Sequence, residues 1–196
     1  MHKMLLEIPS ELETKRLILR PYQEGDGKAF FSLLQNNHEH LREHVDEATD
    51  IKNEEEAEIR VRELSSDWLA RNRFVMVILE KESHTSIGQI WIEPVNWNVP
   101  SFEIGWFLQK DREGKGIITE AVRRCLIFLF EDLNAHKVVV KARETNVRSF
   151  RVAERCNFVK EGLLRDHARI GDNEWVGLLC YGMLKSEYEI LKKDWD

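Results

Sequence analysis

The stretch of sequence that decides the fold comprises two motifs, Ser101-Phe102-Glu103-Ile104-Gly105-Trp106-Phe107-Leu108 and Glu113-Gly114-Lys115-Gly116-Ile117-Ile118. In the first motif, apolar residues recur at every second position, which predicts a half-buried strand. Past the glycines of the second motif, apolar residues recur at helical spacing as far as Leu133. A strand, a glycine loop and a helix N-terminus in succession direct unpaired amides toward one point, which suits an anion such as a pyrophosphate.

Other phosphate-binding loops fit this glycine loop poorly. A dinucleotide-binding fingerprint needs a third glycine where this chain has Thr119. A P-loop needs serine or threonine after its Gly-Lys pair, where this chain has Gly116. An ordinary turn between a strand and a helix is the remaining alternative.

Motifs on either side of this stretch narrow the family. They are Thr14-Lys15-Arg16-Leu17-Ile18-Leu19-Arg20-Pro21 upstream, then Asn146-x-x-Ser149, Phe158-Val159-Lys160-Glu161-Gly162 and Tyr181-Gly182-Met183-Leu184-Lys185. Together with the central stretch, this order resembles the GCN5-related N-acetyltransferases (GNAT), and in particular the branch of ribosomal-protein N-terminal serine and alanine acetyltransferases. The resemblance extends from about Thr14 to the C-terminus.

The resemblance implies a single α/β N-acetyltransferase domain over residues 1–196, with the motifs between about 14 and 186. Its mixed, mostly antiparallel sheet of about seven strands is expected to be splayed between strands 4 and 5 and flanked by about four helices. The patterning predicts strands at residues 15–20, 74–80, 86–93, 101–109, 136–142, 163–170 and 175–184. It predicts helices at 25–36 and 53–70, a long helix ending near 133 and a short one from 146, with an Asn53/Glu56 capping box and a hairpin turn at Gly171-Asp172-Asn173.

Composition agrees with an enzyme of this kind. The chain has 196 residues and 42% hydrophobic content, enough for a sizeable core. Its net charge of −6 disfavours a nucleic-acid partner and favours a cationic one. We find no apolar run of transmembrane length and no signal-peptide pattern, so no membrane partner is expected. Three scattered cysteines indicate neither a disulfide framework nor a metal site, and a cytoplasmic location is expected.

In the resembling family, acetyl-CoA lies between the fourth and fifth strands with its pyrophosphate on the glycine loop. The resemblance therefore implies acetyl-CoA as co-substrate, bound by Glu113, Gly114, Lys115, Gly116, Ile117 and Ile118 in the loop and by Trp106, Phe107 and Leu108 on the strand. The Leu108 N–H is expected to stabilise the oxyanion. Glu113 replaces the usual Gln or Arg and Ile118 a small residue, but backbone amides make most phosphate contacts, so we still expect binding.

Asn146 and Ser149 are the candidate residues after the fifth strand. The resemblance implies that the Asn146 amide reaches the pantetheine; alternatively, Asn146 only caps the short helix. Many relatives carry a tyrosine seven residues beyond this asparagine to protonate the departing thiolate, and this chain has Ala153 there. In the ribosomal-protein branch a serine takes that role, which implies Ser149 as the proton donor; alternatively, its hydroxyl bonds the helix backbone.

The general base is left open by the sequence. Two positions where relatives carry a catalytic glutamate hold Lys141 and Ala168 in this chain. The candidates are therefore Glu103, acting directly or through a water, and His167. Each could instead be a solvated strand residue.

Several further polar residues are expected to be structural. His38, His40 and His44 lack the partners of a known metal motif, so no metal site is predicted. The acidic residues Glu54–Glu58 suit a helix N-terminus, with attraction of a cationic substrate as a second interpretation. Asn157, in place of a glycine, is expected to end the short helix, and Gly177 stands where many relatives carry an aspartate.

The sequence thus predicts an acetyl-CoA-dependent N-acetyltransferase that transfers the acetyl group by direct attack of a primary amine. The acceptor implied by the resemblance is a protein N-terminal α-amine, with a ribosomal protein as one candidate. A small-molecule amine (a polyamine, aminoglycoside or amino acid) is the alternative of the same class. A non-catalytic acyl-CoA-binding regulatory module is the alternative of a different class, and a homodimer is an open alternative for the assembly.

Overall fold

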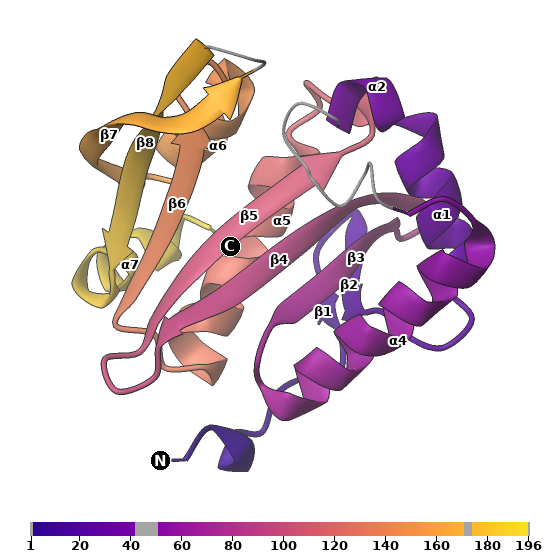
Figure 1. Cartoon of the computed structure of the whole chain (residues 1–196). Coiled ribbons are helices and arrows are strands. Elements are labelled where there is room, and N and C mark those ends of the chain that lie inside the picture. The colour runs from indigo at the N-terminus through magenta and orange to yellow at the C-terminus, as the bar shows by residue number, and fades with distance from the viewer. Residues whose placement is uncertain (1, 42–50, 171–173, 196) are drawn as a thin grey trace. The chain divides into compact units, whose positions relative to one another are not determined.

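Eight strands form the sheet in the part of the chain that the computed structural model describes, residues 2–41, 51–170 and 174–195 (Figure 1). They are β1 (Leu12–Glu13), β2 (Leu17–Pro21), β3 (Phe74–Glu80), β4 (Ser86–Asn96), β5 (Ser101–Leu108), β6 (Lys137–Arg143), β7 (Val159–Ile170) and β8 (Glu174–Leu184). Their order in the sheet is β1-β2-β3-β4-β5-β6-β8-β7. The sheet is mixed and mostly antiparallel, so the predicted class is confirmed. The additional strand, β1, has two residues, too few to display an alternation.

The α-helices in the described part of the chain are α1 (Gly27–Asn36), α2 (His38–Leu41), α4 (Glu54–Ala70), α5 (Ile117–Ile127), α6 (Val147–Arg155) and α7 (Lys185–Leu191). Four of them were predicted, and α2 and α7 are short additions. No described helix is long and apolar enough to cross a membrane. The chain divides into two compact units, Met1–Glu93 with Trp106–Arg124 and Pro94–Gly105 with Cys125–Asp196, and we describe each separately.

The first unit is built on antiparallel pairing of β1 with β2, β2 with β3 and β3 with β4. Strand β3 is buried along its whole apolar run, Phe74–Leu79. Helices α1 and α4 pack on each other and cover one face of these strands (Figure 1). The core between them contains Ile18, Val75, Val77 and Leu79 from the strands, Phe30, Leu33 and Leu34 from α1, and Ala57, Val61 and Leu64 from α4.

Helix α4 begins where the sequence predicts. The Asn53 side chain accepts a hydrogen bond from the Glu56 N–H at 2.8 Å, which confirms the N-cap. The Glu56 carboxylate accepts the Lys52 N–H at 2.9 Å, so its return contact lies one residue before the cap itself. A cap and three first-turn glutamates together compensate the amides and the dipole of this helix start.

The second unit contains β6, α6, β7, β8 and α7, and strand β8 pairs antiparallel with both β6 and β7. Strand β7 begins at Val159, four residues earlier than predicted, because its exposed side chains and two register shifts leave no clean alternation in the sequence. The β7–β8 hairpin is present, although its proposed turn residues, 171–173, lie outside the described residues. Helix α6 ends at Arg155, and Asn157, two residues later, has the expected left-handed conformation with a φ of 64°.

Strands β5 and β6 form the parallel pair of the sheet. Their pairing joins Ser101–Glu103 to Lys137–Val139, which is three residues of strands that contain eight and seven. This short register agrees with the predicted splay between these two strands. The helix after the glycine loop runs as α5 to Ile127 and continues as a π-helical turn over Phe128–Asp132, so the apolar repeat extends beyond the α-helical part.

Candidate active site

The glycine loop between β5 and α5 lies in the first unit. Gly114 and Gly116 adopt φ values of 74° and 73°, a region that side-chain-bearing residues rarely occupy. A Cβ atom at Gly114 would meet nothing within 4 Å, and one at Gly116 would meet only the Arg16 guanidinium, at 3.8 Å. Backbone conformation rather than crowding therefore requires glycine here, and the space above the loop stays open for the approach of a ligand.

The loop is exposed, but both of its ends are anchored. Ile117 and Ile118, which start α5, are 6% and 8% exposed, so the larger residue at 118 fills the core. Upstream, the buried Asn37 accepts the Lys110 N–H at 3.1 Å and donates its Nδ2 to the Leu33 carbonyl at 2.9 Å. Sequence reasoning missed Asn37, because nothing in its local pattern indicates a contact 73 residues away.

The strand before the loop carries the three residues predicted to contact pantetheine. Phe107 and Leu108 are buried and Trp106 is half-buried. Phe107 points into the core below α1 and α4, opposite to the face predicted from the period-two alternation, so this end of β5 is buried on both faces. The Gln109 N–H donates to the Ile87 carbonyl at 2.8 Å, which holds the end of the strand against β4.

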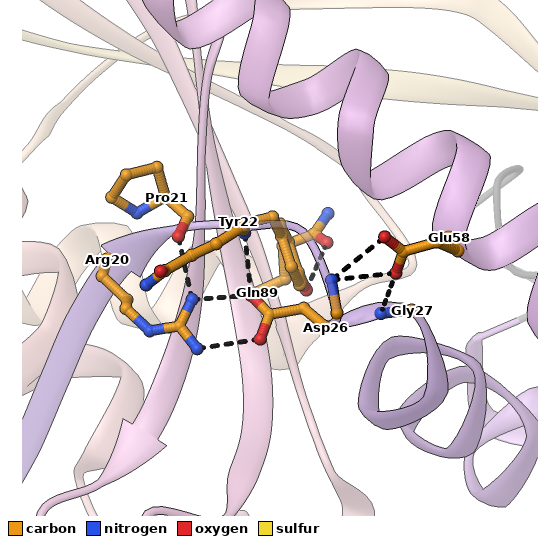
Figure 2. A network of polar contacts seen from close by, with 9 residues as sticks. Arg20, Pro21, Tyr22, Asp26, Gly27, Glu58 and Gln89 are labelled. Atoms are coloured by element: carbon orange, nitrogen blue, oxygen red, sulfur yellow. Dashed lines mark hydrogen bonds and ion pairs between the residues drawn. The ribbon is translucent and has the colours of Figure 1, made fainter.

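A polar network fixes the start of α1 in the same unit (Figure 2). Arg20 donates two hydrogen bonds to the Asp26 carboxylate, at 2.6 and 2.9 Å. Glu58 of α4 accepts the N–H groups of Gly25 and Gly27 at 3.0 Å each. These backbone donors, first that of Gly25, and the Arg62 side chain lower the pKa of Glu58.

This network bears on the predicted attraction of a cationic substrate. Glu56 and Glu58 bond groups of their own unit, whereas Glu54 and Glu55 are exposed. In the same close-up, the buried Gln89 accepts the Tyr22 hydroxyl at 3.0 Å (Figure 2). The acidic segment therefore has a structural role in two of its residues and leaves two carboxylates for solvent or substrate.

Asn146 and Ser149 lie at the start of α6 in the second unit. The Asn146 side-chain oxygen accepts the Ser149 N–H at 3.1 Å. Asn146 therefore caps the helix, which is the alternative role named for it from the sequence. Among the described residues, the Asn146 Nδ2 and the Ser149 hydroxyl have no hydrogen-bond partner, so capping leaves both groups available. The alternative that the Ser149 hydroxyl bonds the helix backbone is not observed in the described part of the chain.

Tyr181 carries another hydroxyl that contacts α6. It donates to a Glu154 oxygen at 3.2 Å. Burial, together with this carboxylate, raises its pKa. The hydroxyl is therefore engaged in the core, whereas that of Ser149 is not.

The two candidate bases lie in different surroundings in the second unit. Glu103 of β5 forms a 2.6 Å ion pair with Lys141 of β6, the residue that occupies a family glutamate position. His167 is exposed in the irregular segment of β7, next to Asp166 with a φ of 50°. An open pocket is lined by Leu163–His167. Both candidates therefore remain open to solvent.

The carboxylate of Glu144 lies beside Gly177 of β8, the position where many relatives carry an aspartate. The Gly177 N–H donates to Glu144 Oε1 at 2.7 Å, and its carbonyl accepts the Glu144 N–H at 2.9 Å. A Cβ at position 177 would lie 2.8 Å from Glu144 Oε1 and 2.7 Å from a Leu163 methyl group. Glu144, which sequence reasoning missed, thus fills the space of a side chain at 177.

The described residues contain no group of three or more His, Cys, Asp or Glu side chains that could hold a metal ion. Of the three histidines considered, His44 lies outside those residues.

Comparison with known proteins identifies the class and then the family. A model described as an acetyltransferase (GNAT) domain matches residues 16–159. The chain therefore belongs to the GNAT acetyltransferases and is an N-acetyltransferase of that type.

Relatives within the family include enzymes named for different substrates. The chain is 27% identical to the uncharacterized N-acetyltransferase p20 of Bacillus licheniformis, over 90% of this chain and 97% of that one. It is 26% identical to a spermidine N(1)-acetyltransferase of Vibrio cholerae (76% and 82% covered) and 25% identical to a ribosomal-protein-serine acetyltransferase of Escherichia coli K12 (81% and 88%).

A solved ribosomal L7/L12 alpha-N-protein acetyltransferase, in complex with coenzyme A, shares the fold. Its TM-score is 0.80 at 20% identity, with 92% of this chain and 98% of that one covered.

Proposed function

We propose that this enzyme transfers an acetyl group from acetyl-CoA to the N-terminal α-amine of a protein. The observation that carries the proposal is the start of α6, where Asn146 caps the helix and Ser149 keeps its hydroxyl unused among the described residues. The relative named as a ribosomal-protein-serine acetyltransferase supports this acceptor.

Acetyl-CoA binding is assigned to the glycine loop and the strand before it. The amides of residues 113–118 receive the pyrophosphate at the start of α5, an 11-residue helix whose dipole favours an anion. Their supporting observation is the pair of positive φ values at Gly114 and Gly116 with open space at both Cβ positions. The backbone edge of the strand at Trp106, Phe107 and Leu108 contacts the pantetheine arm, and the Leu108 N–H donates to the oxyanion.

The chemical step is a direct displacement. The neutral amine nitrogen attacks the thioester carbonyl carbon, the carbonyl electrons move to oxygen, and their return breaks the C–S bond. The Ser149 hydroxyl gives its proton to the departing thiolate, whose ordinary pKa is about 8.5, and is reprotonated from solvent. The proton lost by the amine passes to Glu103, to His167 or to water.

An α-amine is the acceptor that needs least help from such a site. Its pKa is about 8, so a substantial fraction is neutral at physiological pH, whereas a lysine side chain near about 10.4 is almost fully charged. Neither candidate base is enclosed, and Glu103 is already paired with Lys141. A site whose candidate bases are open to solvent therefore favours the more acidic ammonium group.

A polyamine is the second candidate acceptor. The relative named as a spermidine N(1)-acetyltransferase and the net charge of −6 favour it. The exposed carboxylates of Glu54 and Glu55 are suited to a polycation.

An amine panel tests the proposal. Purified protein and acetyl-CoA are incubated with Ser- and Ala-initiated peptides, the same peptides with blocked N-termini but free lysines, and spermidine, while thiol release is followed. We expect the free α-amine peptides to react fastest. Mass-spectrometric mapping that finds acetyl groups only on lysine side chains, or transfer only to spermidine, would contradict the proposed acceptor.

Binding at the glycine loop is tested separately by Gly116→Val. A β-branched residue at a φ of 73° forces the loop out of its conformation, so we expect acetyl-CoA affinity to collapse by about 100-fold or more. Calorimetry measures this effect, and circular dichroism checks that the variant is folded. Unchanged affinity in a folded variant would remove the loop from the acetyl-CoA site.

A further inference from the structure

Arg16 lies just before β2 and contacts Lys115 and Glu120, one on each side of Gly116 in the sequence. Its Nη1 donates to the Lys115 carbonyl at 3.0 Å, and its Nε and Nη2 each lie 2.7 Å from Glu120 Oε2. The Arg16 backbone N–H and the Thr14 hydroxyl donate to the other oxygen of Glu120, at 3.0 and 2.6 Å. All of these residues belong to the first unit.

We propose that Arg16 is a positioning residue that holds the glycine loop in its acetyl-CoA-binding conformation. The inference rests on the proposed role of this loop in binding the pyrophosphate. Arg16 thus supports substrate binding through the loop, without touching the substrate itself.

Peptide geometry explains how the contact acts. A trans peptide unit is planar, so the C=O of Lys115 and the N–H of Gly116 point in opposite directions. Because Arg16 holds the carbonyl on its own side, the Gly116 N–H must point away from Arg16. Because a glycine lies on each side of Lys115, the peptides around it can rotate easily unless a contact restrains them.

Glu120 is the second partner through which Arg16 acts on the loop. Burial alone would raise its pKa, but hydrogen bonds from Thr14 and Arg16 outweigh that effect and lower it. The carboxylate is therefore charged at neutral pH, and it is neutralised by Arg16 instead of facing a bound anion. Since Glu120 stands in the first turn of α5, an unpaired carboxylate there would repel a phosphate.

Overall stability does not account for this arrangement. The Arg16 side chain is 45% exposed, and ion pairs at such exposure contribute little to folding. Arg20, on the same segment of chain, pairs with Asp26 without touching the loop. Although less exposed than Arg16, it controls for the loss of an arginine–carboxylate pair on this segment.

The test compares two acetyl donors. Acetyl-CoA carries the pyrophosphate, whereas S-acetylpantetheine ends before it. For wild type, Arg16→Lys, Arg16→Gln and Arg20→Lys, we measure KM and kcat/KM with both donors, and binding of coenzyme A by calorimetry. Arg16→Lys keeps a charge for Glu120 but lacks the second arm that reaches the Lys115 carbonyl.

We expect both Arg16 variants to raise the KM for acetyl-CoA and the dissociation constant of coenzyme A by about 10-fold or more. Their kcat/KM with S-acetylpantetheine should stay within about two-fold of wild type, because the pyrophosphate contact is absent from that donor. Arg20→Lys should leave KM and kcat/KM unchanged with both donors.

Two results would overturn the inference alone. An equal loss with both donors would mean that Arg16 supports the fold only, and wild-type coenzyme A binding in folded Arg16 variants would mean that the loop needs no such restraint. If wild type itself does not bind acetyl-CoA, the proposed function fails together with this inference.

Discussion

Helices α4 and α6 begin with the same cap and differ in the residue that the cap holds. Asn53 accepts the Glu56 N–H at 2.8 Å, and Asn146 accepts the Ser149 N–H at 3.1 Å. Glu56 turns back to bond Lys52, within a first turn that carries three glutamates. The first turn of α6 has no acidic residue, and the Ser149 hydroxyl has no partner in the described part of the chain.

The difference separates a stabilising helix start from one with spare chemical groups. In α4, the Asn53 cap and the first-turn glutamates stabilise the amides and the dipole of the helix start, and the carboxylates of Glu54 and Glu55 are left exposed. In α6, the same cap hydrogen bond leaves an amide nitrogen and a hydroxyl available, the groups proposed to bind pantetheine and to protonate the thiolate. The predictions below break or sharpen this contrast, beginning with the largest expected effect.

Ser149→Ala should lower turnover by about 100-fold with the best acceptor, because general-acid assistance contributes about 10²–10⁴-fold and water replaces it in part. The KM for acetyl-CoA should change by only a few-fold, since no loop contact is altered. Steady-state kinetics over a range of acetyl-CoA concentrations measures both values.

Two further variants at this position sharpen the result. Ser149→Cys restores an ionisable donor and should recover part of the rate. Ser149→Glu copies the α4 arrangement onto α6, so it should keep the helix stable while turnover stays as low as in Ser149→Ala. Full turnover in Ser149→Ala would show that solvent supplies the proton.

Asn146→Ala and Asn53→Ala should differ in function but not in stability. Each removes one N-cap, which costs about 1 kcal/mol of the free energy of unfolding. Only Asn146→Ala should also raise the KM for acetyl-CoA, by about 10-fold, because a buried hydrogen bond to the pantetheine would be lost. Urea unfolding and initial-rate kinetics on the same preparations check the pair, and equal KM values would leave Asn146 as a cap only.

Glu56→Gln should have a smaller effect, confined to stability. It keeps an oxygen for the Lys52 N–H and loses the charge that faces the helix dipole, which is worth about 0.3–1 kcal/mol. Thermal unfolding at low salt measures the loss, which should shrink at high salt. A change in kcat would contradict the assignment of this helix start to stability.

Loss of the Glu58 charge should have the smallest effect on stability, and this effect should depend on pH. The pKa of Glu58 is lower in the folded chain than its ordinary value of 4.5, first because of the Gly25 N–H and then Arg62 and the Gly27 N–H. Its contribution is therefore fully present above pH 4.5 and is lost as the pH falls through the lowered value. The melting temperatures of wild type and Glu58→Gln should differ at pH 7 and converge in acid; a constant difference would contradict this.

Local features of the chain were predictable because their causes lie within a few residues. The Asn53 and Asn146 caps, the positive φ at Asn157 and the glycine turn follow from side-chain chemistry at known offsets. The family motifs also allowed the class of the sheet, mixed and mostly antiparallel, to be predicted. Strand β7 was predicted too short because an exposed strand with register shifts displays no period.

The candidate site was predictable only as a set of residue types. Neither Glu144 beside Gly177 nor the pairing of Glu103 with Lys141 can be inferred from spacing, because each depends on which strands become neighbours. The second contact also changes the chemistry, since a candidate base is found paired with the lysine that replaced a family glutamate.

The sequence by itself determined where the chain turns, which helices are capped and which residues are candidates for binding a phosphate or donating a proton. The tertiary structure alone decided how the glycine loop is held, through an arginine that lies 104 positions from its carboxylate partner. Periodicity and capping act over one or two turns of chain, whereas such a contact exists only after β2 and α5 have packed and brought both side chains together.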